Sequence, residues 1–199
     1  DVPAEGETNH FAMTATQVGM IYHGDSLPEA GIFHDLFRFE VKKPFHAGRF
    51  KETLDRATNW AAPLRTKFDL GHTEGMQQII ESTGQVVARI NDLRGRVKAP
   101  ENLGALAVSP EWQYDVNQAP LFRVQVDVIS DDKFGLLVGF HHAILDGWSF
   151  ANLMAAILAD YFDIQKITAA PDRGRIQAEA SRQQQQARDN HGDKAYWKP

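Results

Sequence analysis

Two adjacent histidines followed by an aspartate are the residues of this sequence best suited to chemistry near neutral pH. They lie in residues 141–149, which read HHAILDGWS and follow an apolar segment. Histidine exchanges a proton near neutral pH, so a histidine in a cleft could accept the proton of an attacking amine. It could also donate to the oxyanion of a tetrahedral intermediate. Neither role requires a cofactor.

The spacing of this run gives each residue a different expected position. If the preceding strand continues through them, His141 and His142 point to opposite faces. One histidine then faces a cleft and the other packs internally. Asp146 could orient a backbone or meet an arginine, and Gly147 could permit a tight turn or the close approach of a substrate. Ser149 is expected to be the N-cap of the next helix.

A structural role and a metal site are the competing interpretations of the same run. A histidine pair followed by an aspartate often lies in a solvated loop. A metal ion would need His141, His142 and Asp146 as three ligands. Adjacent strand histidines diverge, however, and no distant His-x-x-x-His pattern completes such a set. The sequence therefore predicts no metal.

The surrounding hydrophobic pattern predicts the elements that must position this run. Alternation or apolar runs predict strands at 33–41, 64–70, 76–81, 86–91, 122–128 and 134–140. Helical spacing predicts helices at 14–22 (capped by Thr14), 47–61, 102–112 and about 150–162. Residues 1–12 look irregular. Strand 122–128 has one polar face, whereas strand 134–140 is apolar almost throughout, as in a strand covered on both faces. This mixture predicts an α/β fold with a mixed β-sheet flanked by helices.

Composition narrows the class of function. The 199 residues are 43% hydrophobic and 24% charged, which is typical of a globular domain. A net charge of −5 without a basic block argues against nucleic-acid binding. No stretch approaches the roughly 20 apolar residues of a membrane span. The absence of cysteine is compatible with a reducing cytoplasm, where we expect the protein to lie.

The two ends of the sequence suggest a piece of a longer polypeptide. The chain begins at Asp1 without an initiator methionine and stops at Pro199 within an expected helix. We therefore expect further domains on the same polypeptide.

Several motifs together resemble the condensation domains of nonribosomal peptide synthetases. The run HHxxxDGWS at 141–149 is similar to their signature, and the Trp-Ser extension favours condensation over epimerization. Residues 14–17 resemble the family's first motif, and Leu64-Arg65-Thr66-x-Phe68 resembles its second motif. Residues 119–123 resemble the segment that leads into the strand before the histidines. Residues 195–197 resemble the helix that closes the first lobe. The matches span essentially the whole chain and keep the family's order.

The resemblance implies a fold and a set of roles. It implies one chloramphenicol-acetyltransferase-like lobe over residues 1–199, the N-terminal half of a two-lobed domain whose C-terminal lobe is absent from this sequence. It implies that His142 is catalytic and that His141 orients the loop. Asp146 is expected to form a structural salt bridge with Arg65, and Gly147 to lie beside the reacting carbonyl. Trp148, Ser149 and Gln17 are candidates for the wall of the substrate tunnel.

The resemblance also implies the reaction and its partners. Such a domain joins an acyl or peptidyl thioester to an aminoacyl thioester, forming an amide bond. Upstream and downstream peptidyl carrier proteins present both substrates on phosphopantetheine arms, and the domain binds no cofactor of its own. The missing C-terminal lobe and the neighbouring synthetase domains are further expected partners. One departure concerns Trp60-Ala61-Ala62, where the family usually has Arg-His-Glu.

Two other functions are compatible with the same sequence. A lobe with one tunnel wall could be a docking or scaffold unit without activity of its own, and we expect the isolated chain to be inactive. Alternatively, the chain could be an acyltransferase of the same superfamily that uses coenzyme A. The Trp148-Ser149 pair and the first-motif match argue against that alternative.

Overall fold

The computed structural model describes residues 9–27, 30–71, 75–96 and 103–168, which form two β-sheets and four α-helices. The strands are β1 (Asn9–Ala12), β2 (His34–Val41), β3 (Thr66–Asp69), β4 (Gln77–Ile80), β5 (Ala88–Asp92), β6 (Phe122–Ser130) and β7 (Lys133–His141). The helices are α1 (Ala15–Ser26), α2 (Ala47–Trp60), α3 (Leu103–Ala107) and α4 (Gly147–Tyr161). Two short 3₁₀ helices span Ala62–Arg65 and Pro110–Trp112.

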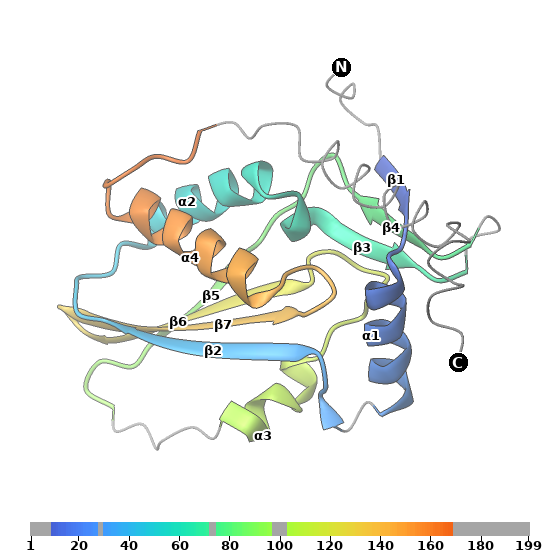
Figure 1. The fold of residues 1–199 in the computed structure, drawn as a ribbon. Coiled ribbons are helices and arrows are strands. Elements are labelled where there is room, and N and C mark those ends of the chain that lie inside the picture. The colour runs from blue at the N-terminus through green and yellow to red at the C-terminus, as the bar shows by residue number, and fades with distance from the viewer. Residues whose placement is uncertain (1–8, 28–29, 72–74, 97–102, 169–199) are drawn as a thin grey trace.

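The larger sheet has the order β2-β7-β6-β5 and carries the histidine run at the end of β7. Strand β5 is parallel to β6, while the β2–β7 and β6–β7 pairs are antiparallel, so the expected mixed sheet is confirmed. Helices α2 and α4 lie side by side across one face of this sheet (Figure 1). Aromatic and aliphatic side chains fill the space between these helices and the sheet. They include Phe50, Leu54, Phe134, Phe140 and Tyr161.

The second face of the large sheet is also covered, which explains why β7 is apolar from Phe134 to Phe140. A segment containing Trp112 and Tyr114 packs against it, and a Cβ at Gly139 would lie 2.7 Å from the Trp112 ring. Only glycine fits this close approach. The polar face expected on β6 is buried as well: Asp127 accepts hydrogen bonds from Asn91 at 2.8 Å and Gln125 at 3.0 Å. Side-chain partners thus permit polar residues at buried positions.

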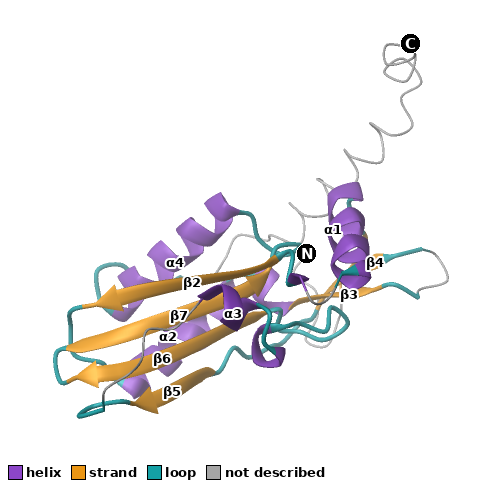
Figure 2. Ribbon diagram, turned by 90° about the horizontal axis from the view of Figure 1, so that it is seen from below, coloured by secondary structure: helices purple, strands orange, loops and turns teal. Residues whose placement is uncertain are grey.

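A smaller antiparallel sheet, β1-β4-β3, lies beside the large one together with helix α1 (Figures 1 and 2). Strand β1 contradicts the expectation that residues 1–12 are irregular, since His10, Phe11 and Ala12 pair with β4. Four residues are too few to show a period, and their strand conformation depends on the pairing partner. The segment 9–12 is therefore a strand because of its tertiary contacts.

Most predicted elements are confirmed within a few residues. Helix α1 has the expected N-cap: Thr14 Oγ1 accepts from the Gln17 backbone N–H at 3.2 Å, and Gln17 Oε1 accepts from the Thr14 N–H at 2.9 Å. This reciprocal pair is a capping box. The helix expected at 102–112 is divided, because Pro110 follows Ser109 and favours an extended conformation there. The match at residues 195–197 lies outside the described residues.

Within the described part of the chain, no helix combines the length and apolarity needed to cross a bilayer.

Candidate active site

The chain reaches the site where β7 leaves the sheet and residues 142–146 form a loop before α4. The last strand residue, His141, is 2% exposed. Its Nδ1 accepts from the Ala143 backbone N–H at 3.1 Å, and its ring contacts the His34 ring edge-on at 5.2 Å between centroids. Burial, with the neighbouring His34 and His142, lowers the pKa of His141 to about 4. His141 is therefore a neutral residue that shapes the loop.

His142 lies on the other side of the chain, as the strand geometry predicted. Its backbone N–H donates to the Phe33 carbonyl at 2.7 Å, and its ring stacks on Phe140 at 6.4 Å with an interplanar angle of 20°. Its Nδ1 is 2.5 Å from Asp35 Oδ2. The half-buried imidazole is thus held by one backbone hydrogen bond, one aromatic contact and one carboxylate.

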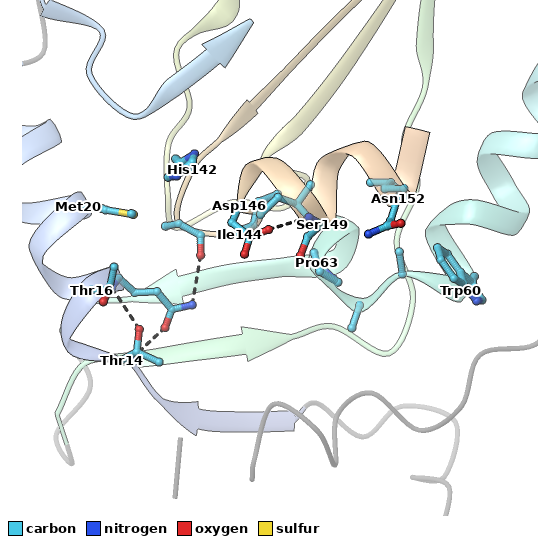
Figure 3. A pocket seen from close by; sticks show the side chains of 16 residues that line it. Thr14, Thr16, Met20, Trp60, Pro63, His142, Ile144, Asp146, Ser149 and Asn152 are labelled. Carbon is cyan, nitrogen blue, oxygen red and sulfur yellow. Dashed lines mark hydrogen bonds between the residues drawn. The ribbon is translucent and has the colours of Figure 1, made fainter. Parts of the chain in front are cut away.

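A cavity of about 860 Å³ opens beside His142. Three regions meet around it: the start of α1, the segment that follows α2, and the loop leading into α4 (Figure 3). Its lining comprises Thr14, Thr16, Gln17, Met20, Trp60, Ala61, Ala62, Pro63, His142, Ala143, Ile144, Leu145, Asp146, Ser149, Asn152 and Leu153. A cavity whose lining combines apolar side chains with polar groups and a histidine is typical of a small-molecule site.

The three residues that depart from the usual Arg-His-Glu of the family lie in the wall of this cavity. Trp60, Ala61 and Ala62 all line it, so replacing charged side chains there leaves an apolar wall. Met20, from the first motif, lines the same cavity from α1 (Figure 3). The three positions at which the second motif is preceded by unusual residues are therefore part of the cavity wall.

Gln17 lines the cavity, but its side chain is engaged in holding the loop. Its Nε2 donates to the Ala143 carbonyl at 3.2 Å and to Gln78 Oε1 at 3.1 Å, and the residue is 8% exposed. Because Gln17 Oε1 also accepts from the Thr14 N–H, this side chain connects the start of α1 to the histidine loop. Of the other two tunnel candidates, Ser149 lines the cavity, whereas Trp148 is 79% exposed and lies outside its lining.

Asp146 is the N-cap of α4, a role expected of Ser149. Asp146 Oδ1 accepts from the Ser149 backbone N–H at 2.6 Å, so the helix begins about three residues earlier than predicted. Hydrogen bonds from Ser149 lower the pKa of this carboxyl. Gly147 is the first residue of the helix, and a Cβ there would meet nothing within 4 Å. Gly147 is not among the residues that line the cavity, so its expected place beside a reacting carbonyl stays a prediction.

The expected salt bridge between Asp146 and Arg65 is wrong for this structure. The guanidinium of Arg65 donates to three backbone carbonyls instead: Thr58 at 3.1 Å, Ser82 at 3.3 Å, and Glu81. Arg65 ends a 3₁₀ helix, and its side chain satisfies carbonyls at the end of α2 and after β4. Burial lowers the pKa of Arg65. Arg65 therefore connects the end of α2 to the segment after β4, and Asp146 uses its carboxylate to cap a helix.

Sequence reasoning missed Asp35, the carboxylate that contacts His142. One signal was present, because Asp35, Phe37 and Phe39 alternate along β2 and so share one face. An aspartate at the end of an apolar stripe indicates a local partner. The three residues weighed as metal ligands do not converge, and the described residues contain no group of three histidine, aspartate or glutamate side chains placed to hold a metal.

Comparison with known proteins identifies what this arrangement resembles. A family model described as the condensation domain matches residues 7–199. The AMB antimetabolite synthetase AmbE of Pseudomonas aeruginosa is 31% identical over 171 residues, which cover 80% of this chain and 8% of that protein. Tyrocidine synthase 3 of Brevibacillus parabrevis is 20% identical over 157 residues, covering 78% of this chain and 2% of that protein.

Solved structures share the fold. The starter condensation domain of rhizomide synthetase RzmA matches with a TM-score of 0.74 at 20% identity, over 94% of this chain and 47% of that one. A four domain nonribosomal peptide synthetase bound to AMP and glycine matches with a TM-score of 0.65 at 22% identity. The match covers 81% of this chain and 12% of that one. This chain thus spans about half of the solved domain and less than a tenth of the curated relatives.

Proposed function

Since this chain belongs to the condensation-domain family, we propose that it is the N-terminal, histidine-bearing lobe of a domain that forms amide bonds in nonribosomal peptide synthesis. The observation that carries the proposal is His142, held at the wall of a cavity at the end of a buried strand. The other wall of the substrate tunnel then belongs to a C-terminal lobe outside this sequence.

The proposed reaction joins two carrier-bound thioesters. The amine of the aminoacyl acceptor attacks the carbonyl carbon of the acyl or peptidyl donor, and its proton passes to Nε2 of His142. The tetrahedral intermediate collapses by breaking the C–S bond, and the departing thiolate receives the proton. The products are an amide on the acceptor carrier and a free thiol on the donor carrier. His142 is thereby returned to its starting state.

The remaining residues prepare this step without touching the reacting atoms. His141, neutral and buried, accepts from Ala143 and sets the turn of the loop. Asp146 starts α4, and Gly147 leaves open space where the reacting carbonyl could pass. Trp60, Met20 and Ile144 give the cavity an apolar wall against which a substrate side chain could pack. Holding both reactants beside one base supplies the orientation that an uncatalysed encounter lacks.

The proposed partners follow from the same reaction. Upstream and downstream peptidyl carrier proteins would deliver the substrates on their phosphopantetheine arms, so the domain needs no cofactor of its own. Neighbouring synthetase domains and the C-terminal lobe complete the assembly. A cytoplasmic location is part of the proposal, supported by the absence of cysteine.

The test is a His142→Ala change in the complete synthetase module, with both carriers loaded. We expect dipeptidyl product formation to fall by about 10²-fold or more, the usual contribution of a positioned general base. His23→Ala is the matched control, because His23 is an exposed histidine on α1 outside the cavity lining. Undiminished product from the His142 variant would overturn the assignment.

A further inference from the structure

The nearest charged group to His142 belongs to β2, an element that carries none of the sequence motifs. Asp35 and His142 are 107 positions apart, yet Asp35 Oδ2 lies 2.5 Å from Nδ1 of the imidazole. Both side chains are about two-thirds buried, with 36% and 31% of their surfaces exposed. Such a short contact between a carboxylate and an imidazole is a charge-assisted hydrogen bond.

Strand β2 positions this carboxylate through its pairing with β7. In the antiparallel register Asp35 faces Phe140, two residues before His142. Asp35 lies on the face of β2 that also presents Phe37, whose ring stacks on Phe140 at 6.1 Å, and the Phe140 ring stacks in turn on His142. Strand register therefore places the carboxylate of Asp35 and the imidazole of His142 on the same side of the sheet as the stacked rings of Phe37 and Phe140.

The backbone before β2 contributes a second contact to the same histidine. Phe33 has a φ of 65°, a left-handed conformation that is rare for a bulky residue. Its carbonyl accepts the His142 backbone N–H at 2.7 Å. Non-glycine residues are held in such conformations where the surrounding structure over-determines them, often at functional sites. Phe33, just before β2, and Asp35, near the start of β2, therefore both hold His142, one at its backbone and the other at its ring.

The hydrogen bond to Asp35 determines which imidazole nitrogen carries the proton. An ionised carboxylate can only accept, so Nδ1 must donate, and in the neutral ring Nε2 then holds the lone pair. We propose that Asp35 is a positioning residue that keeps His142 in the tautomer with Nδ1 protonated, leaving Nε2 to accept the proton of the acceptor amine. This inference rests on the proposed function of His142 and adds a residue that the condensation motifs do not contain.

Two other titratable groups adjoin His142 and have different duties. The carboxylate of Asp146 caps α4 by accepting from the Ser149 N–H, and His141 accepts from the Ala143 N–H. Neither Asp146 nor His141 contacts the His142 Nδ1 atom, which is hydrogen-bonded to Asp35. After proton transfer the imidazolium would remain paired with Asp35, and the proton would leave Nε2 for the departing thiolate.

The proposal is tested by kinetics on the complete module with Asp35→Asn, Asp35→Ala and Asp35→Glu. We expect Asn and Ala to lower kcat for amide formation by about tenfold or more, while KM for the loaded acceptor carrier changes less than about twofold. Glu, which restores a carboxylate on a longer stem, should recover part of the loss. Glu40→Gln is the matched control, because it removes a carboxylate from the same strand, where Glu40 pairs with Lys133. Wild-type kcat in both Asn and Ala variants would overturn the proposal.

The tautomer provides a readout that a purely structural role would not change. In ¹⁵N spectra of the histidine-labelled two-lobed domain, wild-type His142 should show the proton on Nδ1, and Asp35→Ala should lose that preference. A wild-type ring protonated on Nε2 would contradict the proposal. The His142→Ala variant separates the two claims: if it loses activity while the Asp35 variants keep it, only the role of Asp35 fails. If His142→Ala stays active, the assigned function of His142 itself fails.

Discussion

The side-chain amide of Gln17 donates to the carbonyl of Ala143 at 3.2 Å and so joins the first helix to the loop that carries His142. The two residues are 126 positions apart. The other end of the same amide caps α1 by accepting from Thr14. One glutamine thus couples the start of a helix to the geometry of the candidate active site.

This relationship predicts that Gln17→Glu harms the loop more than the helix cap. Glutamate keeps an oxygen for the Thr14 N–H but places a second oxygen opposite the Ala143 carbonyl. Leaving a buried carbonyl without its donor costs about 1–3 kcal/mol, so we expect a lower free energy of unfolding in urea and slower amide formation. Thr14→Ala removes the cap and is the control, with an expected loss of about 1 kcal/mol and a smaller effect on rate. Full activity in Gln17→Glu would contradict this coupling.

Burial of His141 predicts a pH-dependent stability. Its pKa is lowered to about 4 in the folded protein from an ordinary value of 6.5, so between these pH values the unfolded chain binds the proton and the folded chain does not. The free energy of unfolding should therefore be highest above pH 6.5 and decrease as the pH falls toward 4, by at most about 3 kcal/mol.

His141→Asn provides the comparison for that pH dependence, because an amide oxygen can accept the Ala143 N–H without titrating. The slope of unfolding free energy against pH should become smaller in this variant. It should not vanish, since burial also lowers the pKa of His34. An unchanged slope in urea unfolding series from about pH 4 to about pH 7 would show that His141 is not the titrating group.

The N-cap role of Asp146 predicts different outcomes for two substitutions. Asp146→Asn keeps an acceptor for the Ser149 N–H and should change the free energy of unfolding by only a few tenths of a kcal/mol, whereas Asp146→Ala should lose about 1 kcal/mol. Urea unfolding distinguishes them. If Asn is as harmful as Ala, the charge matters more than the cap, and an ion pair with an arginine would again be the better explanation.

The buried ion pair between α2 and α4 predicts a larger loss. Asp160 is fully buried and accepts from Thr53 Oγ1 at 2.6 Å, Arg56 Nη2 at 2.6 Å and the Ile167 N–H at 2.9 Å. Burial alone would raise the pKa of Asp160, but these hydrogen bonds lower it to about 2. Stability from this group is therefore present above pH 3.8 and lost as the pH falls toward 2.

Asp160→Asn should lower the free energy of unfolding at neutral pH by about 3 kcal/mol, because it leaves the guanidinium of Arg56 without its buried anion and with only the exposed Glu52 at 3.9 Å. Lys51→Ala, which removes the exposed pair with Asp55, is the control and should cost less than about 1 kcal/mol. Equal effects of the two substitutions would show that burial adds nothing to the Arg56–Asp160 pair.

The isolated 199-residue chain is expected to give negligible condensation. If the second wall of the substrate tunnel belongs to a C-terminal lobe, as proposed, this chain alone cannot orient two carrier-bound substrates. The measurement is dipeptidyl product formed by the purified chain with loaded carriers, compared with the complete module. Turnover near the rate of the module would contradict the need for a second lobe.

Local sequence patterns were sufficient for most of the elements and for placing the two histidine side chains on opposite sides of the chain. The alternation of a strand places His141 and His142 on opposite sides, and the helical spacing of α2 and α4 identifies their buried faces. These predictions succeed because side-chain direction repeats with the period of the backbone, which neighbouring residues alone determine. The cap at Thr14 is local for the same reason.

Tertiary structure alone decided which of these faces meet. The partners of Arg65, the strand conformation of β1 and the contacts of His142 with Asp35 and Phe33 all join segments distant in sequence. A local period indicates that a residue faces inward but not what lies opposite, since that depends on strand order and register across the whole sheet. The sequence by itself therefore indicated the candidate histidine and the loop that carries it, whereas packing of the strands determined which carboxylate contacts it.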